Sequence, residues 1–137
     1  MLQDILNQIP GMLQNNTNWD KYLPPENNQQ WTELSTDKLT KLKTLGIEAL
    51  NTPWPSLPAS LYMDFARTGN RSHFEDPYFL RRILLSRMVN AWCSGEKSPK
   101  MLDGIINALA GICEELSWVV PAHNWPHTNI LPPAQPD

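Results

Sequence analysis

The residues best able to do chemistry lie near the end of the sequence, in the stretch GICEELSWVVPAHNWPH from Gly111 to His127. The stretch contains adjacent carboxylates, two indoles and two imidazoles: Glu114, Glu115, Trp118, Trp125, His123 and His127. Carboxylates and imidazoles act as general acids and bases, and an indole offers a broad apolar face with a polar N–H at its edge. The stretch is therefore a candidate for an active site, for one wall of a binding site, or for an ordinary helix end.

The two glutamates occupy the predicted C-terminal end of a helix, where the helix dipole disfavours a carboxylate by about 0.3–1 kcal/mol. Two explanations are open. Arginines of the preceding helix can neutralise the glutamates, and the candidates are Arg81, Arg82 and Arg87. Alternatively, one glutamate points into a groove as a binding group, an acid or a base. Adjacent helical residues lie about 100° apart, so only Glu114 or Glu115 is expected to face such a groove.

The two histidines have the H-x3-H spacing of many metal sites. However, Pro126 lies between His123 and His127 and disfavours the regular helix that would align the two imidazoles. Cys93 and Cys113 lack a CxxC spacing and are predicted to be buried free thiols within helices. We therefore expect no metal site and no other cofactor. Hydrogen-bonded packing in a loop is the alternative role for the histidines.

A second charged and aromatic cluster, FARTGNRSHFEDPYFLRR, covers residues 65–82. Ion pairs within a capped loop explain most of it. The sharper alternative is a binding site for an anionic group through Arg71, because a guanidinium binds a carboxylate with two parallel hydrogen bonds.

The tryptophans of the first stretch also have two possible explanations. Trp118 and Trp125 either stack on sugar rings or seal a core at a helix end.

The composition limits the class of protein. The 137 residues have a mass of 15.7 kDa, which suits one domain, and the net charge is −3 with scattered lysines and arginines. Such a distribution lacks the basic patch of a nucleic-acid-binding protein. No run approaches the roughly 20 apolar residues of a membrane span, and the start MLQDILNQIPG does not resemble a signal peptide. For the chain as given we expect a cytoplasmic protein with no nucleic-acid or membrane partner.

Four helices are expected to position these residues. Each is predicted from a cap or a proline at its start, an apolar stripe at spacings of three and four, and a glycine or proline after its end. The expected ranges are about 36–51, 58–68, 77–94 and 99–116. Asp76 and Ser98 are the expected caps of the last two helices, with Pro77 and Pro99 at their first positions. The short connection SGEKS makes these two an antiparallel hairpin, so the predicted fold class is all-α.

The same periodicity predicts the core and the domain limits. Leu84 of the third helix and Ile106 of the fourth are expected to be core residues. Residues 1–34, which are rich in Asn and Gln, are expected to form an irregular arm. Residues 35–122 are expected to form the helical domain, and residues 123–137 a proline-rich tail.

Two of these segments together resemble a known family. The sequences YMDFARTGNRSHFEDPYFLRRILLSRMVNAWCSGE and MLDGIINALAGICEELSWVVPAHN are similar to the N-terminal helical part of heparinase II/III-like proteins. That part carries an F.R.GNR..FE...F.RR segment before a helix pair and an ICEE.SW..PAH segment after it. The likeness covers residues 57–124, about half of the chain. It implies an incomplete α/α toroid of stacked helical hairpins, followed in full-length members by a β-sandwich.

The resemblance also implies a function. The relatives are polysaccharide lyases, which neutralise a uronate carboxylate, remove the C5 proton with a Tyr or His base and expel the 4-linked sugar. Their main Asn, Tyr and His machinery comes from later helices and from the sandwich. We therefore expect an N-terminal fragment or stand-alone piece that binds an acidic polysaccharide, is not catalytic alone and contains no catalytic residue. The expected substrate-binding residues are Arg71, Glu114, Glu115, Trp118, His123 and Trp125.

A small helical protein–protein interaction domain is the alternative function. Stacked hairpins bury the outer face of each hairpin against the next, so an isolated piece leaves an apolar face open to water. We therefore expect the chain to self-associate, or to pair with the missing C-terminal part of the family architecture.

Overall fold

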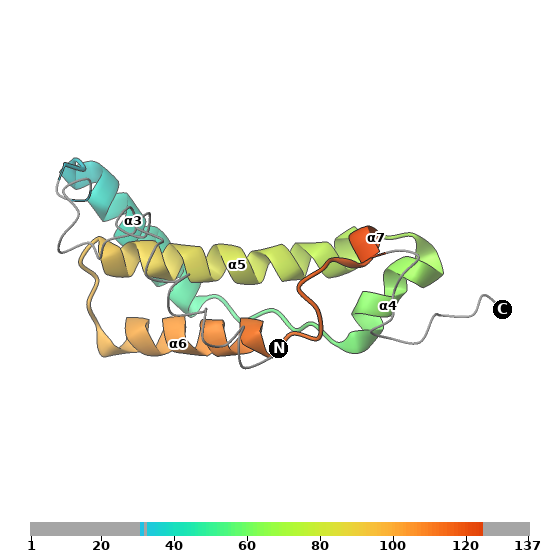
Figure 1. The fold of residues 1–137 in the computed structure, drawn as a ribbon. Helices are drawn as coiled ribbons and strands as arrows, with labels where there is room; N and C mark the ends of the chain where they lie inside the picture. Colours follow the sequence, from blue (N-terminus) through green and yellow to red (C-terminus); the bar gives the residue numbers. More distant parts are fainter. Residues whose placement is uncertain (1–30, 32, 125–137) are drawn as a thin grey trace, which may run out of the picture. The chain divides into compact units, whose positions relative to one another are not determined.

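The structure is a computed structural model that describes residue 31 and residues 33–124 (Figure 1). The chain divides into two compact units, Met1–Leu34 and Ser35–Asp137, and helices α3 to α7 belong to the second. Their bounds are α3, Thr36–Asn51; α4, Ala59–Thr68; α5, Ser72–Cys93; α6, Pro99–Cys113; and α7, Pro121–Asn124. No strand occurs among the described residues, so the predicted all-α class is confirmed. The arm expected at 1–34 lies almost wholly outside the described residues, and residues 125–137 lie wholly outside them.

Helices α3 and α4 form where the sequence predicts them. Ser35 precedes α3 in an extended conformation, and Asp37 lies in its first turn, where a carboxylate complements the helix dipole. Helix α3 ends before the proline-rich link to α4. Pro58 directly precedes α4, and Gly69 ends that helix in the left-handed conformation with a φ of 75°. Side chains rarely tolerate that φ, which explains a glycine at this stop.

Helix α5 begins earlier than predicted. The expected start at Pro77, capped by Asp76, is wrong, because α5 begins at Ser72 and contains Pro77 in its interior. The reason is a cap further upstream. The side-chain oxygen of Asn70 accepts a hydrogen bond from the His73 backbone N–H at 3.2 Å, which satisfies a donor of the first turn.

Two further interactions stabilise the turn that precedes Pro77. Arg71 Nε donates to Glu75 Oε1 at 3.0 Å, a pair one helical turn apart. Phe74 is buried and contributes apolar contact. A proline inside a helix removes one backbone hydrogen bond, and these contacts offset that loss.

Helices α5 and α6 form the predicted antiparallel hairpin. The two helices lie side by side along most of the length of α6 (Figure 1). Gly95 turns the chain with a φ of 99°. Ser98 Oγ then accepts a hydrogen bond from the Met101 backbone N–H at 3.3 Å, and Pro99 occupies the first turn of α6. The cap and proline signals of the sequence therefore set this connection.

Helix α6 ends at Cys113, before the predicted residue 116. Two of its last carbonyls have partners outside the helix. Gly111 O accepts a hydrogen bond from Arg81 Nη1 at 3.3 Å, and Ile112 O accepts one from Trp118 Nε1 at 3.1 Å. Because these side chains satisfy the carbonyls, the backbone is free to leave the helical path.

The sequence analysis did not predict the short helix α7, which begins at Pro121. Helix α7 packs on α4, where Asn124 Nδ2 donates to the Tyr62 hydroxyl at 3.2 Å. The expected boundary between residues 122 and 123 falls within this helix.

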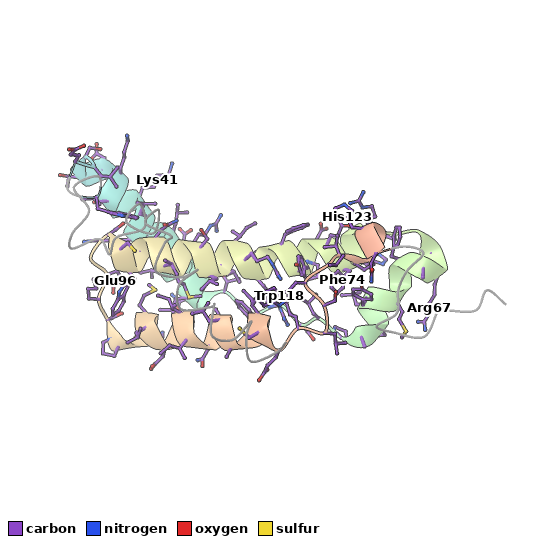
Figure 2. All side chains as sticks on the ribbon, in the orientation of Figure 1. Lys41, Arg67, Phe74, Glu96, Trp118 and His123 are labelled. Atoms are coloured by element: carbon purple, nitrogen blue, oxygen red, sulfur yellow. The ribbon has the colours of Figure 1, made fainter. Side chains whose placement is uncertain are left out.

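The core consists of two clusters. The larger one joins α3, α5 and α6 through Ala49, Leu84, Met88, Ala91, Met101, Ile105 and Ala108. The smaller one joins α4 and the start of α5 to the segment before α7 through Tyr62, Phe74, Tyr78 and Val120. Figure 2 shows side chains filling the space between α5 and α6. Gly46 allows α3 to cross close to α5, because an added Cβ would overlap the side chain of Ala91.

Leu84 is buried as predicted, with 2% of its surface exposed, but the predicted burial of Ile106 is wrong. Ile106 is 53% exposed. The reason is that α6 carries apolar residues around more than one face, and its packed face uses Met101, Ile105 and Ala108. The predicted burial of the two thiols is also wrong, because Cys113 is exposed and Cys93 is only half-buried, although both lie in helices as predicted.

We predict that Leu84→Ala destabilises the chain by about 2–5 kcal/mol, because it leaves a cavity in the larger cluster. Ile106→Ala is the matched control and is expected to cost about 0.5 kcal/mol or less, because that side chain is mostly in water. Urea unfolding followed by circular dichroism measures both. Equal losses would contradict the assignment of Leu84 to the core and of Ile106 to the surface.

Candidate functional site

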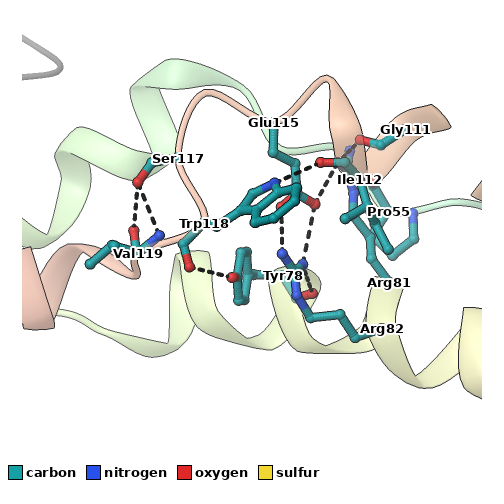
Figure 3. A network of polar contacts seen from close by, with 10 residues as sticks. All are labelled: Pro55, Tyr78, Arg81, Arg82, Gly111, Ile112, Glu115, Ser117, Trp118 and Val119. Atoms are coloured by element: carbon teal, nitrogen blue, oxygen red, sulfur yellow. Dashed lines mark hydrogen bonds and ion pairs between the residues drawn. The ribbon is translucent and has the colours of Figure 1, made fainter. Parts of the chain in front are cut away.

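The centre of the site is the carboxylate of Glu115, which is held between two arginines of α5 (Figure 3). Arg82 Nη2 lies 2.6 Å from Oε2, and Arg81 Nη1 lies 3.2 Å from Oε1. Only 4% of the Glu115 side chain is exposed. The explanation in which arginines neutralise the glutamates is therefore confirmed for Glu115, through Arg81 and Arg82. Within the described residues, Arg87 forms no ion pair with either glutamate.

Arg81 also fixes two other segments. Its Nε donates to Pro55 O at 2.8 Å in the link between α3 and α4, and its Nη1 donates to Gly111 O at 3.3 Å near the end of α6. Its guanidinium carbon lies 5.4 Å from the centre of the Trp54 ring. One largely buried side chain thus holds the link, α5 and α6 in fixed positions (Figure 3).

Tyr78 connects this network to the segment after α6. Its hydroxyl donates to Trp118 O at 2.7 Å, and the guanidinium carbon of Arg82 lies 3.4 Å from its ring centre. Burial raises the pKa of the Tyr78 hydroxyl above its ordinary value of about 10. The positive charge of Arg82 opposes this shift, and the negative charge of Glu115 adds to it. Tyr78 therefore remains a hydrogen-bond donor at neutral pH.

A second polar cluster lies where α4 meets α5. His73 Nδ1 and Asp64 Oδ2 are 2.6 Å apart, and His73 Nε2 lies 3.1 Å from Asn70 Nδ2. Asn70 Oδ1 already accepts from the His73 backbone, so its Nδ2 is placed as the donor to Nε2. The proton of the neutral imidazole then lies on Nδ1, directed at Asp64. These contacts fix the GNRSH loop rather than leave its polar groups open.

A pocket of about 290 Å³ opens beside the Glu115 network. Its apolar and aromatic walls include Trp54 and Leu57 from the link, Tyr62 from α4 and Phe74 from α5. Its charged wall consists of Arg81, Glu114 and Glu115. Among the described residues Glu114 forms no ion pair, and it is exposed. The pocket therefore combines apolar rings with one available carboxylate.

The residues predicted for the site are only partly brought together. Glu114 and Glu115 line the pocket, whereas Arg71, Trp118 and His123 are not among its lining residues. Arg71 is paired with Glu75, and Trp118 is 65% exposed beside the end of α6. His123 is exposed on α7. Trp125 lies outside the described residues, as does the second histidine of the H-x3-H pair.

Sequence reasoning missed the aromatic residues of the pocket. Trp54 lies in the segment NTPWPSLP, between Pro53 and Pro55, and the prolines were used only as helix stops. Two prolines around one indole restrict the backbone on both sides of it, and this is the local signal that the sequence offered. The position of Tyr62 had no such local signal, because it depends on the packing of α4 against α5.

No protein-family model matches the sequence, and no curated protein matches it. Within residues 31 and 33–124, no helix combines the length and the apolar character that crossing a membrane requires. The same part of the chain contains no group of three or more side chains that could hold a metal ion.

We predict that Glu115→Gln lowers the free energy of unfolding by about 3–5 kcal/mol, because it leaves two partly buried guanidinium groups without their counter-charge. Glu114→Gln changes the adjacent carboxylate in the same way and is expected to cost less than about 0.5 kcal/mol, because that group is exposed. Denaturant unfolding of both variants at pH 7 measures the difference. Similar stabilities of the two variants would contradict the structural role of Glu115.

The raised pKa of Tyr78 predicts a loss of stability at alkaline pH. A folded pKa above the unfolded one means that the stabilisation is complete below pH about 10 and is lost as the pH rises through the folded pKa. At pH 8, Tyr78→Phe is expected to cost about 1 kcal/mol through the lost hydrogen bond to Trp118 O. The gap between the two proteins should narrow above pH 10. Urea unfolding at a series of pH values tests this, and a constant gap would contradict it.

Proposed function

We propose that this helical domain forms one wall of a saccharide-binding cleft of the heparinase II/III-like type, within an incomplete α/α toroid, and that it binds sugar without catalysing alone. The observation that carries the proposal is the meeting of the two segments that resemble the family. Arg82 of the first pairs with Glu115 of the second, Tyr78 bonds to Trp118 O, and Tyr62 bonds to Asn124. Motifs far apart in the sequence thus build one site.

The chemistry of the pocket supports a sugar ligand. A sugar ring presents apolar C–H faces and a rim of hydroxyl groups, so it suits a site with aromatic faces and a few polar groups. Trp54 and Tyr62 supply the aromatic surface, and Glu114 supplies an available hydrogen-bond acceptor. Both glutamates of the ICEE segment line the pocket, although only one of them was expected to face a groove.

The charges explain why binding rather than catalysis is proposed. Elimination beside a uronate carboxylate requires a group that neutralises this carboxylate, together with a base and an acid for the leaving group. Arg81 is the cation that lines the pocket, and it already contacts Glu115 and two backbone carbonyls. Its donors are therefore largely used within the domain, where it shares Glu115 with Arg82. The remaining catalytic groups would come from other parts of the family architecture.

The second candidate function is a protein–protein interaction domain, and one observation favours it. Large apolar side chains of α5 and α6 remain exposed: Phe79, Leu80, Ile83, Leu102, Ile106 and Leu109. Exposed apolar surface of this kind favours association with a second protein surface. Ile106→Glu is expected to abolish self-association and to leave sugar binding at the pocket unchanged. Sedimentation over a range of protein concentrations measures the self-association and so distinguishes the two functions.

We predict that the chain binds polysaccharide fragments weakly and releases no unsaturated product. Calorimetry with a set of neutral and uronate hexasaccharides measures the binding, and ultraviolet absorbance measures the product. Glu114→Gln is expected to weaken binding about 3- to 10-fold, as the loss of a charged hydrogen-bond acceptor does. Asp76→Asn is the matched control, because that carboxylate is exposed on α5 and does not line the pocket.

Two results would contradict the proposed function. One is the absence of binding by every hexasaccharide. The other is equal binding by the Glu114→Gln and Asp76→Asn variants, which would remove the pocket from the binding site. Formation of an unsaturated product that disappears in His123→Ala would instead overturn the proposal that the domain is not catalytic alone.

A further inference from the structure

A second pocket, of about 500 Å³, lies next to the one described above. One wall is the end of α3 and the link that follows, including Leu50 and Thr52. The other wall is α6, which contributes Lys100, Asp103 and Asn107 at helical spacing. This wall carries polar groups that the resemblance and the proposed function leave unused.

The two pockets share three lining residues, Trp54, Gly111 and Glu114. Gly111 permits the close approach of the indole, because an added Cβ would lie 3.0 Å from Trp54 Nε1. The ring thus lies against α6 at the junction of the pockets. We use the name Trp54 groove for the two pockets together. A groove with an aromatic residue at its middle suits an extended ligand better than a compact one.

The charges of the Trp54 groove favour a ligand without acidic groups. Glu114 and Asp103 both line it, and neither forms an ion pair in the part of the chain that the structure describes. The lining contains two positive residues, Arg81 and Lys100, and three negative ones, Asp103, Glu114 and Glu115, so its own net charge is −1. A carboxylate on the ligand would therefore approach two carboxylates of the protein, which is unfavourable. Sugar hydroxyls, in contrast, donate hydrogen bonds to such oxygens.

We propose that the Trp54 groove binds a linear saccharide through at least two successive uncharged sugar units, one in each pocket, with Trp54 as the shared platform. Glu114 accepts hydrogen bonds from hydroxyls at the junction, and Asn107 and Asp103 bind the unit in the second pocket. The proposal rests on the proposed function and deepens it. It assigns the uncharged units of the polysaccharide to this wall and leaves a uronate unit to another wall.

The test uses the full chain and calorimetric titration with β-1,4-glucan, β-1,4-mannan and β-1,4-xylan oligosaccharides, as disaccharides and hexasaccharides, and with an oligogalacturonate hexasaccharide. We expect at least one neutral hexasaccharide to bind, and to bind more tightly than the oligogalacturonate. Asn107→Ala should weaken the neutral hexasaccharide and its disaccharide about 3- to 10-fold each, because two successive units already reach the second pocket. Trp54→Phe should weaken both, because it reduces the stacking surface.

The outcomes separate this inference from the proposed function. If Glu114→Gln weakens the hexasaccharide but Asn107→Ala does not, the first pocket binds alone and the two-pocket groove is wrong. If the oligogalacturonate binds more tightly than every neutral hexasaccharide, the assignment of uncharged units is wrong while saccharide binding stands. If no saccharide binds, both fail. Circular dichroism and unfolding midpoints for Asn107→Ala and Trp54→Phe show whether each variant keeps the native fold.

Discussion

The buried carboxylate of Glu115 is the interaction on which the site depends. A carboxylate withdrawn from water is costly unless charged donors replace the lost hydration, and Arg81 and Arg82 provide those donors. Because both arginines belong to α5 and Glu115 follows α6, the pairs fix how the hairpin closes at this end. Arg81 then extends the constraint to the link before α4 through Pro55 O. The pocket exists because these segments cannot separate without exposing unpaired charge.

Much of the fold could be predicted from local signals. Ser98 with Pro99 and Gly69 act within one turn of their own positions, so a sequence pattern detects them directly. The predicted start of α5 was wrong because two sequence patterns competed. Asp76 and Pro77 match a helix start, yet Asn70 caps an earlier turn whose burial depends on contact with α4. A local pattern contains no information on contacts between helices, so the sequence favoured the start at Asp76 and Pro77.

The site was less predictable, for a related reason. The sequence suggested arginines as partners of the glutamates because the helix dipole left the carboxylates in need of compensation, and this reasoning succeeded for Glu115. It did not find Trp54, because the place of that ring depends on Arg81 and on the absence of a side chain at Gly111. The prediction that Ile106 is buried was wrong for a similar reason. The apolar residues of α6 show which faces of the helix can be buried, but they do not show which face is buried.

The two glutamates show how adjacent positions come to serve different roles. The backbone leaves α6 at this point, so Glu115 is carried inward to the arginines while Glu114 stays in water. The inner carboxylate pairs with both guanidinium groups and offsets one of their two positive charges. The outer carboxylate lines both pockets beside Trp54 and forms no ion pair within the described residues. If the pocket binds a saccharide as proposed, the interaction that holds the hairpin closed also affects the charge that the ligand meets, and Glu115 then couples stability to recognition.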